Sequence, residues 1–427
     1  MNKYSTIAKE SEAKYMEFLK ILVEGKNKVG TKFCIEMLTG ILKSSSVLLS
    51  EITRKSERKI DVKNGVERLS NQLNKFDGSE LSKRYLRIVR PNLPENPLIY
   101  VDGTDIIKPC AKRMEGLARI TDGSKKHTIG NGYYVNEIAA ITLSGQPVSL
   151  CSTLYSVKEK GFLSSNDVML DDITTVLRNV SRQGTFIFDR GLDDVKTHIF
   201  LQKLEQNYIF RANNKRHILI GGKERNIVGA AKNIKSKYDF SIKYTSGKKY
   251  DLRVGYKQVA LINNAETQIT MVVVQGYKED DEPFILLTNR KIEGEEACLS
   301  VVRDYLSRWK IEEYFKFKKQ NYRWENVRAR KLKALKNINV FLSIAIGFLG
   351  LMQRLHYSKQ IMFLAKPIKE KVAFNYYRFH AGFMRLIPLF KTKIFEYFYP
   401  PPSPNNLTPL ERYAVYKNHH KNFKKFA

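Results

Sequence analysis

The chain has 427 residues, of which 43% are hydrophobic and 11% aromatic, which excludes a globally disordered polymer and suits one large core with attached units. It carries 74 Lys and Arg against 43 Asp and Glu, a formal net charge of +31, which favours nucleic acid as the partner. A ribosome-associated or membrane-surface protein would share this charge, but here basic residues alternate with aromatic residues along the chain, which favours an extended nucleic-acid-binding surface.

The cysteines and apolar segments indicate a protein of a reducing cytoplasm. The four cysteines lie far apart and form no C-x-x-C pair, so neither a disulfide framework nor a zinc cluster is predicted. The N-terminal segment lacks the apolar core of a signal peptide. The longest apolar stretch, Val340 to Met352, is shorter than the roughly 20 residues that span a bilayer, so we expect a buried helix.

Residues 1–90 predict a separate helical, DNA-binding domain. Apolar residues recur at helical spacing in YMEFLKILVEG and FCIEMLTGILKSSSVLLSEI. The stretch LLSEITRKSERKIDVKNGVERLSNQLNKF contains two short amphipathic pieces around a basic turn, which suits a helix-turn-helix presented to DNA. A helical packing or oligomerisation module would give the same pattern.

Residues 91–212 switch to the pattern of an α/β core. Strands are predicted in PLIYVDGT, GYYVNEIAAITL and PVSLCSTLYS, then a helix in NDVMLDDITTVLRNV, a strand in TFIFD, a helix in HIFLQKLEQ and a fifth strand in NYIFRA. This order is typical of a ribonuclease-H-like core, a mixed sheet with flanking helices. Residues 213–296 then predict a β-rich insertion, residues 297–355 the completion of the core, and residues 356–427 a basic helical region with a Pro-rich tail.

Two acidic residues stand where predicted apolar strands end. Asp102 follows LIYV and precedes Gly103, and Asp189 follows TFIF with a glycine two residues later. One such motif alone is typical of a turn, but two carboxylates at a sheet rim suit Mg²⁺, which takes hard oxygen ligands and keeps phosphate oxygens. The neighbouring alternatives are Asp105, which lies past the strand end, and Asp193 and Asp194, which suit the first turn of the next helix.

The predicted helix SVVRDYLSRWKIEEYFKFKKQ carries a third acidic residue. At about 100° per residue, one narrow face of this helix collects four side chains, namely Tyr305, Arg308, Glu312 and Lys319. Such a face can hold a metal and grip DNA phosphates beside it, although an ordinary charged helix surface gives the same pattern. Glu313 points about 100° away, which indicates a surface or structural role. Trp309 suits packing beneath the face, with stacking on an extruded base as the alternative.

The motifs D-G-T-D, F-I-F-D-R-G and Y-x-x-R-x-x-x-E-x-x-x-x-x-x-K together resemble the DDE transposases of bacterial insertion sequences, in the "IS-four" family defined by a Tyr-Arg-Glu-Lys signature. The resemblance covers roughly residues 97–350, including the β-rich insertion. It implies that Asp102, Asp189 and Glu312 bind two Mg²⁺ or Mn²⁺ ions. It also implies DNA-positioning roles, which fall to Tyr305, Arg308, Lys319 and, as a lesser candidate, Arg211.

The resemblance further implies a homodimer that synapses two terminal inverted repeats of double-stranded DNA, cuts them and joins them to target DNA. The two metals would assist in-line attack at phosphorus without a covalent protein intermediate. A DNA-binding regulator without catalysis and a nuclease without strand transfer are the alternatives. Neither a G-x-x-x-x-G-K-[ST] nor a G-x-S-x-G motif is present, so ATP hydrolysis and serine-hydrolase chemistry have no support.

Overall fold

The computed structural model describes residues 3–57, 60–121, 123, 128–180, 182–243, 249–262, 264–276, 284–365 and 374–400. The Pro-rich, basic tail predicted at the C-terminal end lies outside these residues. The longer helices are α1 (Lys3–Val23), α2 (Lys28–Ser44), α4 (Val62–Lys75), α5 (Ser79–Val89), α6 (Ser165–Val180), α7 (Val195–Lys203), α9 (Glu295–Leu306), α10 (Trp309–Asn321), α11 (Leu332–Met352) and α13 (Tyr376–Leu386). The shorter helices are α3 (Leu49–Arg54), α8 (Ile227–Lys232), α12 (Ser358–Leu364) and α14 (Ile394–Phe398).

One mixed sheet runs through the protein, so the fold is mixed α/β. Among the described residues its strand order is β2-β3-β1-β5-β6-β12-β11-β10-β7-β8, with β4 paired to β3 and β9 paired to β10. The strands are β1 (Leu98–Ile107), β2 (Ala118–Thr121), β3 (Ile129–Ile141), β4 (Pro147–Tyr155), β5 (Thr185–Phe188), β6 (Asn207–Arg211), β7 (His217–Ile220), β8 (Lys223–Asn226), β9 (Tyr238–Lys243), β10 (Lys249–Leu261), β11 (Asn264–Gln275) and β12 (Phe284–Thr288).

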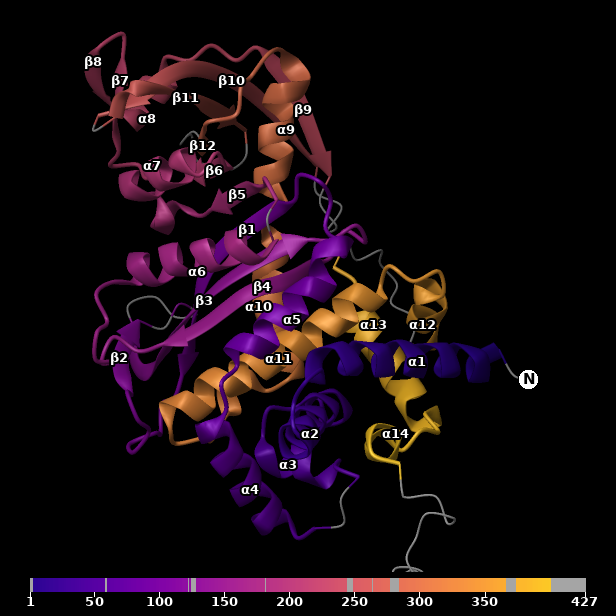
Figure 1. Ribbon diagram of the computed structural model, residues 1–427. Coiled ribbons are helices and arrows are strands. Elements are labelled where there is room, and N and C mark those ends of the chain that lie inside the picture. Colours follow the sequence, from indigo (N-terminus) through magenta and orange to yellow (C-terminus); the bar gives the residue numbers. More distant parts are fainter. Residues whose placement is uncertain are drawn as a thin grey trace, which may run out of the picture.

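The five strands predicted for the core are all observed, as β1, β3, β4, β5 and β6. β3 is antiparallel to both β1 and β4, whereas β5 runs parallel to both β1 and β6. A parallel neighbour requires a crossover connection, and α6 and α7 supply the crossovers into β5 and β6. The strands of the predicted insertion continue the same sheet, because β12 pairs antiparallel with β6, and Figure 1 shows them stacked above the core strands.

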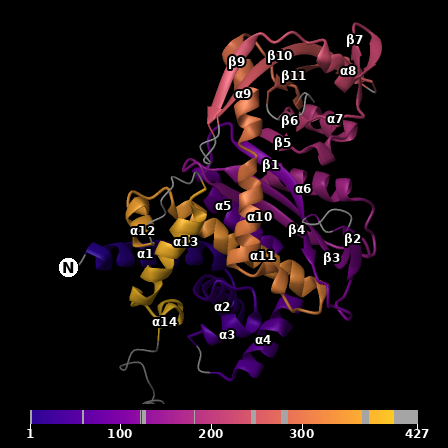
Figure 2. The same ribbon diagram turned by 180° about the vertical axis from the view of Figure 1, so that it is seen from behind.

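The N-terminal helices pack around α11, the most apolar of the longer helices in the described part of the chain. α11 is long and apolar enough to cross a membrane, but 83% of its most apolar window is buried inside the protein, as predicted for the stretch that ends at Met352. Phe341 contacts the rings of Phe33 and Phe76, and Phe348 contacts that of Tyr15, so α1 and α2 are held by aromatic packing. Figure 2 shows α11 between this helical layer and α10.

The two short pieces predicted around a basic turn are observed as α3 and α4. Asp61 caps α4, because its side chain accepts hydrogen bonds from the backbone amides of Lys63 and Asn64. Residues 58 and 59 of the turn lie outside the described residues. The apolar face of α4 is directed inward, since Leu69 and Leu73 are fully buried.

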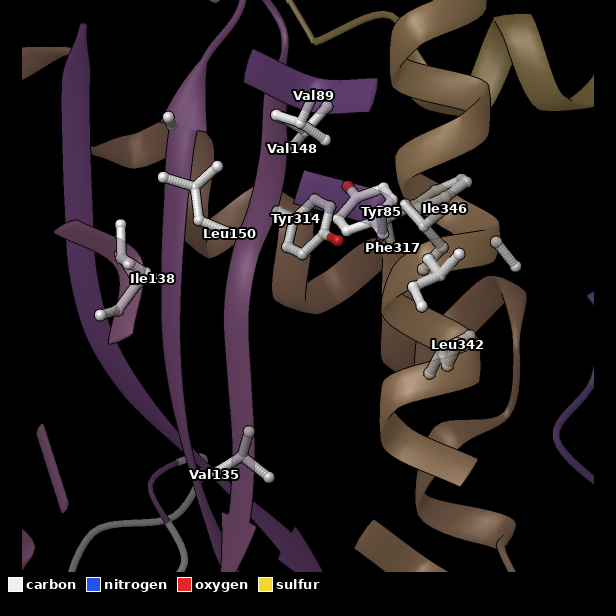
Figure 3. Close-up of a cluster of buried hydrophobic side chains, with 14 of the residues drawn as sticks. Tyr85, Val89, Val135, Ile138, Val148, Leu150, Tyr314, Phe317, Leu342 and Ile346 are labelled. Atoms are coloured by element: carbon white, nitrogen blue, oxygen red, sulfur yellow. The ribbon is translucent and has the colours of Figure 1, made fainter. Parts of the chain in front are cut away.

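Gly347 lies at the closest approach between α11 and the N-terminal helices. A Cβ atom at this position would stand 2.0 Å from the hydroxyl oxygen of Tyr85 in α5. Figure 3 shows Tyr85 beside Phe317 and Ile346, and Tyr85 is only 3% exposed, so its ring is enclosed by the core. The absence of a side chain at Gly347 therefore lets α5 dock on the core.

We predict that Gly347→Ala lowers the free energy of unfolding by about 1–3 kcal/mol, the usual cost of overpacking. Gly229→Ala is the matched control, because Gly229 is also helical and an added Cβ there meets no atom within 4 Å. It should leave stability unchanged or raise it by up to about 1 kcal/mol. Urea unfolding followed by circular dichroism measures both variants, and an unchanged midpoint for Gly347→Ala would contradict the packing described above.

Candidate active site

Asp102 and Asp189 are neighbours because of the register between two parallel strands. The last paired residues of β1 and β5 are Val101 and Phe188. Asp102 directly follows Val101, and Asp189 directly follows Phe188. Adjacent strands lie about 4.8 Å apart, so the two carboxylates emerge side by side. Asp189 directly follows the end of β5, as predicted.

The prediction that Asp102 ends its strand is wrong. β1 continues to Ile107, because β3 pairs with it along its whole length, from Ile99 to Ile107. β5 stops at Phe188, so Asp102 marks the point where β1 loses one of its two neighbours. The carboxylate of Asp102 therefore lies at an edge of the sheet because β5 ends beside it, and not because β1 ends there.

The prediction of one continuous helix from the region of Tyr305 to Lys319 is also wrong. α9 ends at Leu306 and α10 begins at Trp309. Between them the backbone tightens into i to i+3 hydrogen bonds, from the Arg308 amide to the Tyr305 carbonyl (2.9 Å) and from the Ile311 amide to the Arg308 carbonyl (3.0 Å). The four signature residues therefore do not lie on one face of a single helix. The tight turn between α9 and α10 brings Tyr305, Arg308 and Glu312 close together.

Arg308 contacts all three candidate metal ligands from the centre of this turn. Its Nη1 lies 2.7 Å from Oδ2 of Asp102, and its Nη2 lies 2.5 Å from Oε1 of Glu312 and 4.0 Å from Oδ1 of Asp189. Its side chain is only 12% exposed, whereas that of Glu312 is 50% exposed. The planar guanidinium is suited to such multiple carboxylate contacts.

The carboxylates differ in their electrostatic environments. Burial raises the pKa of Asp102 to about 6, Arg308 opposes this shift, and the charges of Asp189 and Glu312 add to it. Burial also tends to raise the pKa of Asp189. Its pKa is nevertheless below the ordinary value, because the carboxylate is stabilised by Arg308, by the Arg190 amide and by the Tyr305 hydroxyl. The two neighbouring carboxyl groups therefore have pKa values shifted in opposite directions.

Tyr305 and Arg211 border the site on the side of Asp189. The Tyr305 hydroxyl donates a hydrogen bond to Oδ1 of Asp189 (3.1 Å), and burial raises the pKa of this phenol well above its ordinary value, so it remains a donor. The Arg211 guanidinium lies 4.9 Å from the ring centroid of Phe284, which contacts the Tyr305 ring edge-on. The charge of Arg211 contributes to the lowered pKa of Asp189.

Lys319 lies away from the three carboxylates. Its Nζ is 3.0 Å from Oε1 of Glu325 and 3.7 Å from Oδ2 of Asp105. Lys319 follows Glu312 by seven residues, so it stands about 10 Å farther along the helix axis. Trp309 is half-buried and packs against the larger hydrophobic core.

The sequence matches the family described as "Transposase DDE domain" over residues 97–348, more than half of the chain. This chain belongs to the DDE transposase-domain family. No curated protein sequence matches it. Among solved structures, a piggyBac transposase synaptic complex with hairpin DNA is similar with a TM-score of 0.43 and 10% identity, covering 90% of this chain and 75% of that one. The NurA nuclease from Sulfolobus solfataricus aligns with a TM-score of 0.26 and 9% identity, over 60% of this chain and 89% of its own.

The donor chemistry of this transposase domain fits a divalent metal. Mg²⁺ and Mn²⁺ prefer carboxylate oxygens, and Asp102, Asp189 and Glu312 supply them within reach of one guanidinium. In the described residues no group of three His, Cys, Asp or Glu side chains is already gathered in the geometry of a metal site. Arg308 stands between the carboxylates, so metal binding would require its guanidinium to move aside.

The alternative aspartates form other contacts. Asp105 is buried and lies 3.7 Å from Nζ of Lys319. The prediction that Asp193 belongs to the first turn of a helix is wrong, because α7 begins at Val195. The buried carboxylate of Asp193 lies instead 2.6 Å from Nε of Arg216 and 2.9 Å from Nε2 of His198. Asp194 is the residue that immediately precedes α7, close to its predicted place. Glu313 pairs with Lys316 on the surface, 2.6 Å apart.

A buried ion pair below the site was not predicted from the sequence. The Lys318 Nζ, fully buried in α10, lies 2.8 Å from Oε2 of Glu137 in β3 and also donates to Ser343 of α11. The same ammonium stands 4.3 Å from the ring centroid of Trp324. Glu137 is the register partner of Asp102, so this pair fixes the helix that carries Glu312 to the strand beside the first aspartate.

We predict that Asp102→Asn stabilises the fold at pH 7.5. The pKa of Asp102 is about 6 in the folded protein against an ordinary 3.8, so folding disfavours its ionised form. The loss of folding free energy caused by ionised Asp102 is absent below pH 4, grows between pH 4 and 6, and is fully present above pH 6. In EDTA, urea unfolding should show a gain of about 1–3 kcal/mol at pH 7.5 that disappears at pH 4. A variant less stable than wild type at pH 7.5 would mean that attraction to Arg308 outweighs burial.

We predict that Lys318→Met lowers the free energy of unfolding by about 3–5 kcal/mol, because Glu137 is left as a buried, uncompensated charge. Adding Glu137→Leu should restore most of the loss. Lys316→Met is the matched control from the exposed pair of the same helix, with a cost of at most about 1 kcal/mol. Equal effects of Lys316→Met and Lys318→Met in urea unfolding would refute a special role for the buried pair.

Proposed function

We propose that this protein is an active transposase of the "IS-four" type, which cuts DNA at terminal inverted repeats and joins the ends to target DNA in the bacterial cytoplasm. The observation that carries the proposal is the convergence of Asp102, Asp189 and Glu312 on Arg308, inside a transposase DDE domain. The strand order β4-β3-β1-β5-β6 supports a ribonuclease-H-like core for this site. The net charge of +31 supports a DNA substrate.

The three carboxylates would hold two Mg²⁺ or Mn²⁺ ions, which supply activation of the attacking oxygen and stabilisation of the leaving one. Asp102 of β1 and Asp189, which follows β5, would both supply carboxylate oxygens to these ions. Glu312 approaches from α10 and is half-exposed, so that DNA can reach it.

Arg308 and Tyr305 would bind the DNA backbone at the cut. In the protein alone, Arg308 neutralises the carboxylates; once cations do so, its guanidinium is free to pair with a phosphate. Tyr305 holds Asp189 in orientation through its hydroxyl. Arg211 adds positive charge beside Asp189, and Lys319 would contact a phosphate farther along the strand. A homodimer that synapses two DNA ends completes the proposal.

The decisive experiment is cleavage of labelled DNA that carries the repeats flanking the native gene, in Mg²⁺, Mn²⁺ or EDTA. We predict cutting at the repeat end that requires metal and falls at least about 1,000-fold in Glu312→Gln, equal to about 4 kcal/mol of transition-state stabilisation. Glu313→Gln is the matched control, since Glu313 is the next residue and makes only a surface pair with Lys316.

Each other outcome has a definite meaning. Tight binding without cutting in either metal would replace the proposal by a DNA-binding regulator. Cutting without joining to a target plasmid would replace it by a nuclease. Wild-type cutting by Glu312→Gln would remove this residue from the metal site.

A further inference from the structure

A basic groove opens beyond Lys319, on the side away from the three carboxylates. Its cavity volume is about 990 Å³, and its walls are the segment that follows β1, residues 107–114, and the segment between α10 and α11, residues 325–330. Glu325 is the acidic residue in this lining, and its carboxylate is paired with Lys319. Five basic residues share the lining, namely Lys108, Lys112, Arg113, Arg328 and Arg330.

The groove is preformed, because hydrogen bonds join its two walls. Lys108 extends across the floor and donates from Nζ to the backbone carbonyls of Glu325 (2.7 Å) and Val327. At the far end, the Glu115 amide donates to the Arg330 carbonyl (2.8 Å). Lys108 is therefore committed to the architecture of the groove and is not available to a ligand.

The other four basic residues are exposed and uncompensated. Lys112, Arg113, Arg328 and Arg330 are all exposed, and none of them forms an ion pair within the described part of the chain. Burial lowers the pKa of Lys108, the charge of Glu325 opposes this effect, and the charge of Arg328 adds to it. Such a preformed concentration of positive charge favours a polyanion.

Lys319 links the groove to the candidate active site. Its Nζ lies 3.7 Å from Oδ2 of Asp105 in β1 and 3.0 Å from Oε1 of Glu325 in the groove wall. Lys319 stands about 10 Å from Glu312 along the helix, a length equal to about three base pairs of duplex at about 3.4 Å of axial rise each. A DNA strand held at the carboxylates would pass Lys319 and reach the groove within a few nucleotides.

We propose that this groove binds the phosphodiester backbone of DNA a few nucleotides from the reacting phosphate, and that its exposed arginines form phosphate contacts there. The inference rests on the proposed function for the nature of the polyanion. These contacts set the register of the strand on the carboxylates and carry no sequence specificity.

Cys110 provides a direct probe, because it lines the groove and is exposed. The remaining cysteines are Cys34 and Cys298, which are buried, and Cys151, which is partly buried, so a maleimide-benzophenone reagent should label Cys110. The full-length protein labelled at Cys110 is irradiated with a 40-base-pair DNA duplex in EDTA. The control label is Lys359→Cys on α12, in a Cys110→Ser background.

We predict efficient crosslinking from Cys110 and at least tenfold less from the control position. The triple variant Arg113→Gln, Arg328→Gln, Arg330→Gln should lose at least tenfold in crosslinking, and the salt dependence of its DNA binding should weaken by about three phosphate contacts. The corresponding Arg→Lys variant keeps the charges and should retain binding. The control that removes three exposed charges elsewhere is Lys359→Gln, Arg385→Gln, Lys391→Gln, which should bind as wild type.

The results separate the two proposals. Equal crosslinking from Cys110 and from the control position, with metal-dependent cleavage intact, would overturn the groove and leave the transposase function standing. Crosslinking that depends on the arginines, in a protein that never cuts DNA, would support the groove and remove the catalytic proposal. A duplex RNA of the same length that outcompetes the DNA would overturn DNA as the ligand.

Discussion

Three carboxylates around one side chain repel each other, and the guanidinium of Arg308 between them opposes this repulsion. It contacts Asp102 and Glu312 directly and stands 4.0 Å from Asp189. The parallel register of β1 and β5 sets the first two carboxylates side by side, and the turn after α9 delivers the third together with its counterion. Burial and, to a smaller extent, the neighbouring carboxylates raise the pKa of Asp102, and Arg308 opposes these effects only in part.

The helix that carries Glu312 is fixed to the sheet at both ends by charge. At its start Arg308 pairs with Asp102, and near its end Lys318 pairs with Glu137 in the interior. Buried ion pairs add little net stability compared with apolar packing, but they allow very few alternative arrangements. Glu312 therefore sits between two fixed points, which suits a ligand that must meet a metal at a defined distance.

The sequence predicted the core strands, the position of Asp189 and the buried nature of α11, because those depend on local apolar runs. It did not predict that β1 continues past Asp102, since that depends on pairing with β3, about 30 residues away. No glycine or proline lies near the break at Ser307, so the helical periodicity of the sequence predicted one continuous helix there. Asp193 and Lys318 have ordinary local contexts, and their burial depends on Arg216 and Glu137, which only the folded chain brings to them.

The pairing of β12 with β6 makes the strands between Asp189 and Glu312 part of the same sheet as the carboxylates. Excision of β7 to β12 would expose one side of β6, with its backbone amide and carbonyl groups unpaired. Such an edge strand is a template for pairing with other chains. Shortened or chimeric versions of this protein would therefore have to retain β12, or cover that edge in another way, to avoid aggregation.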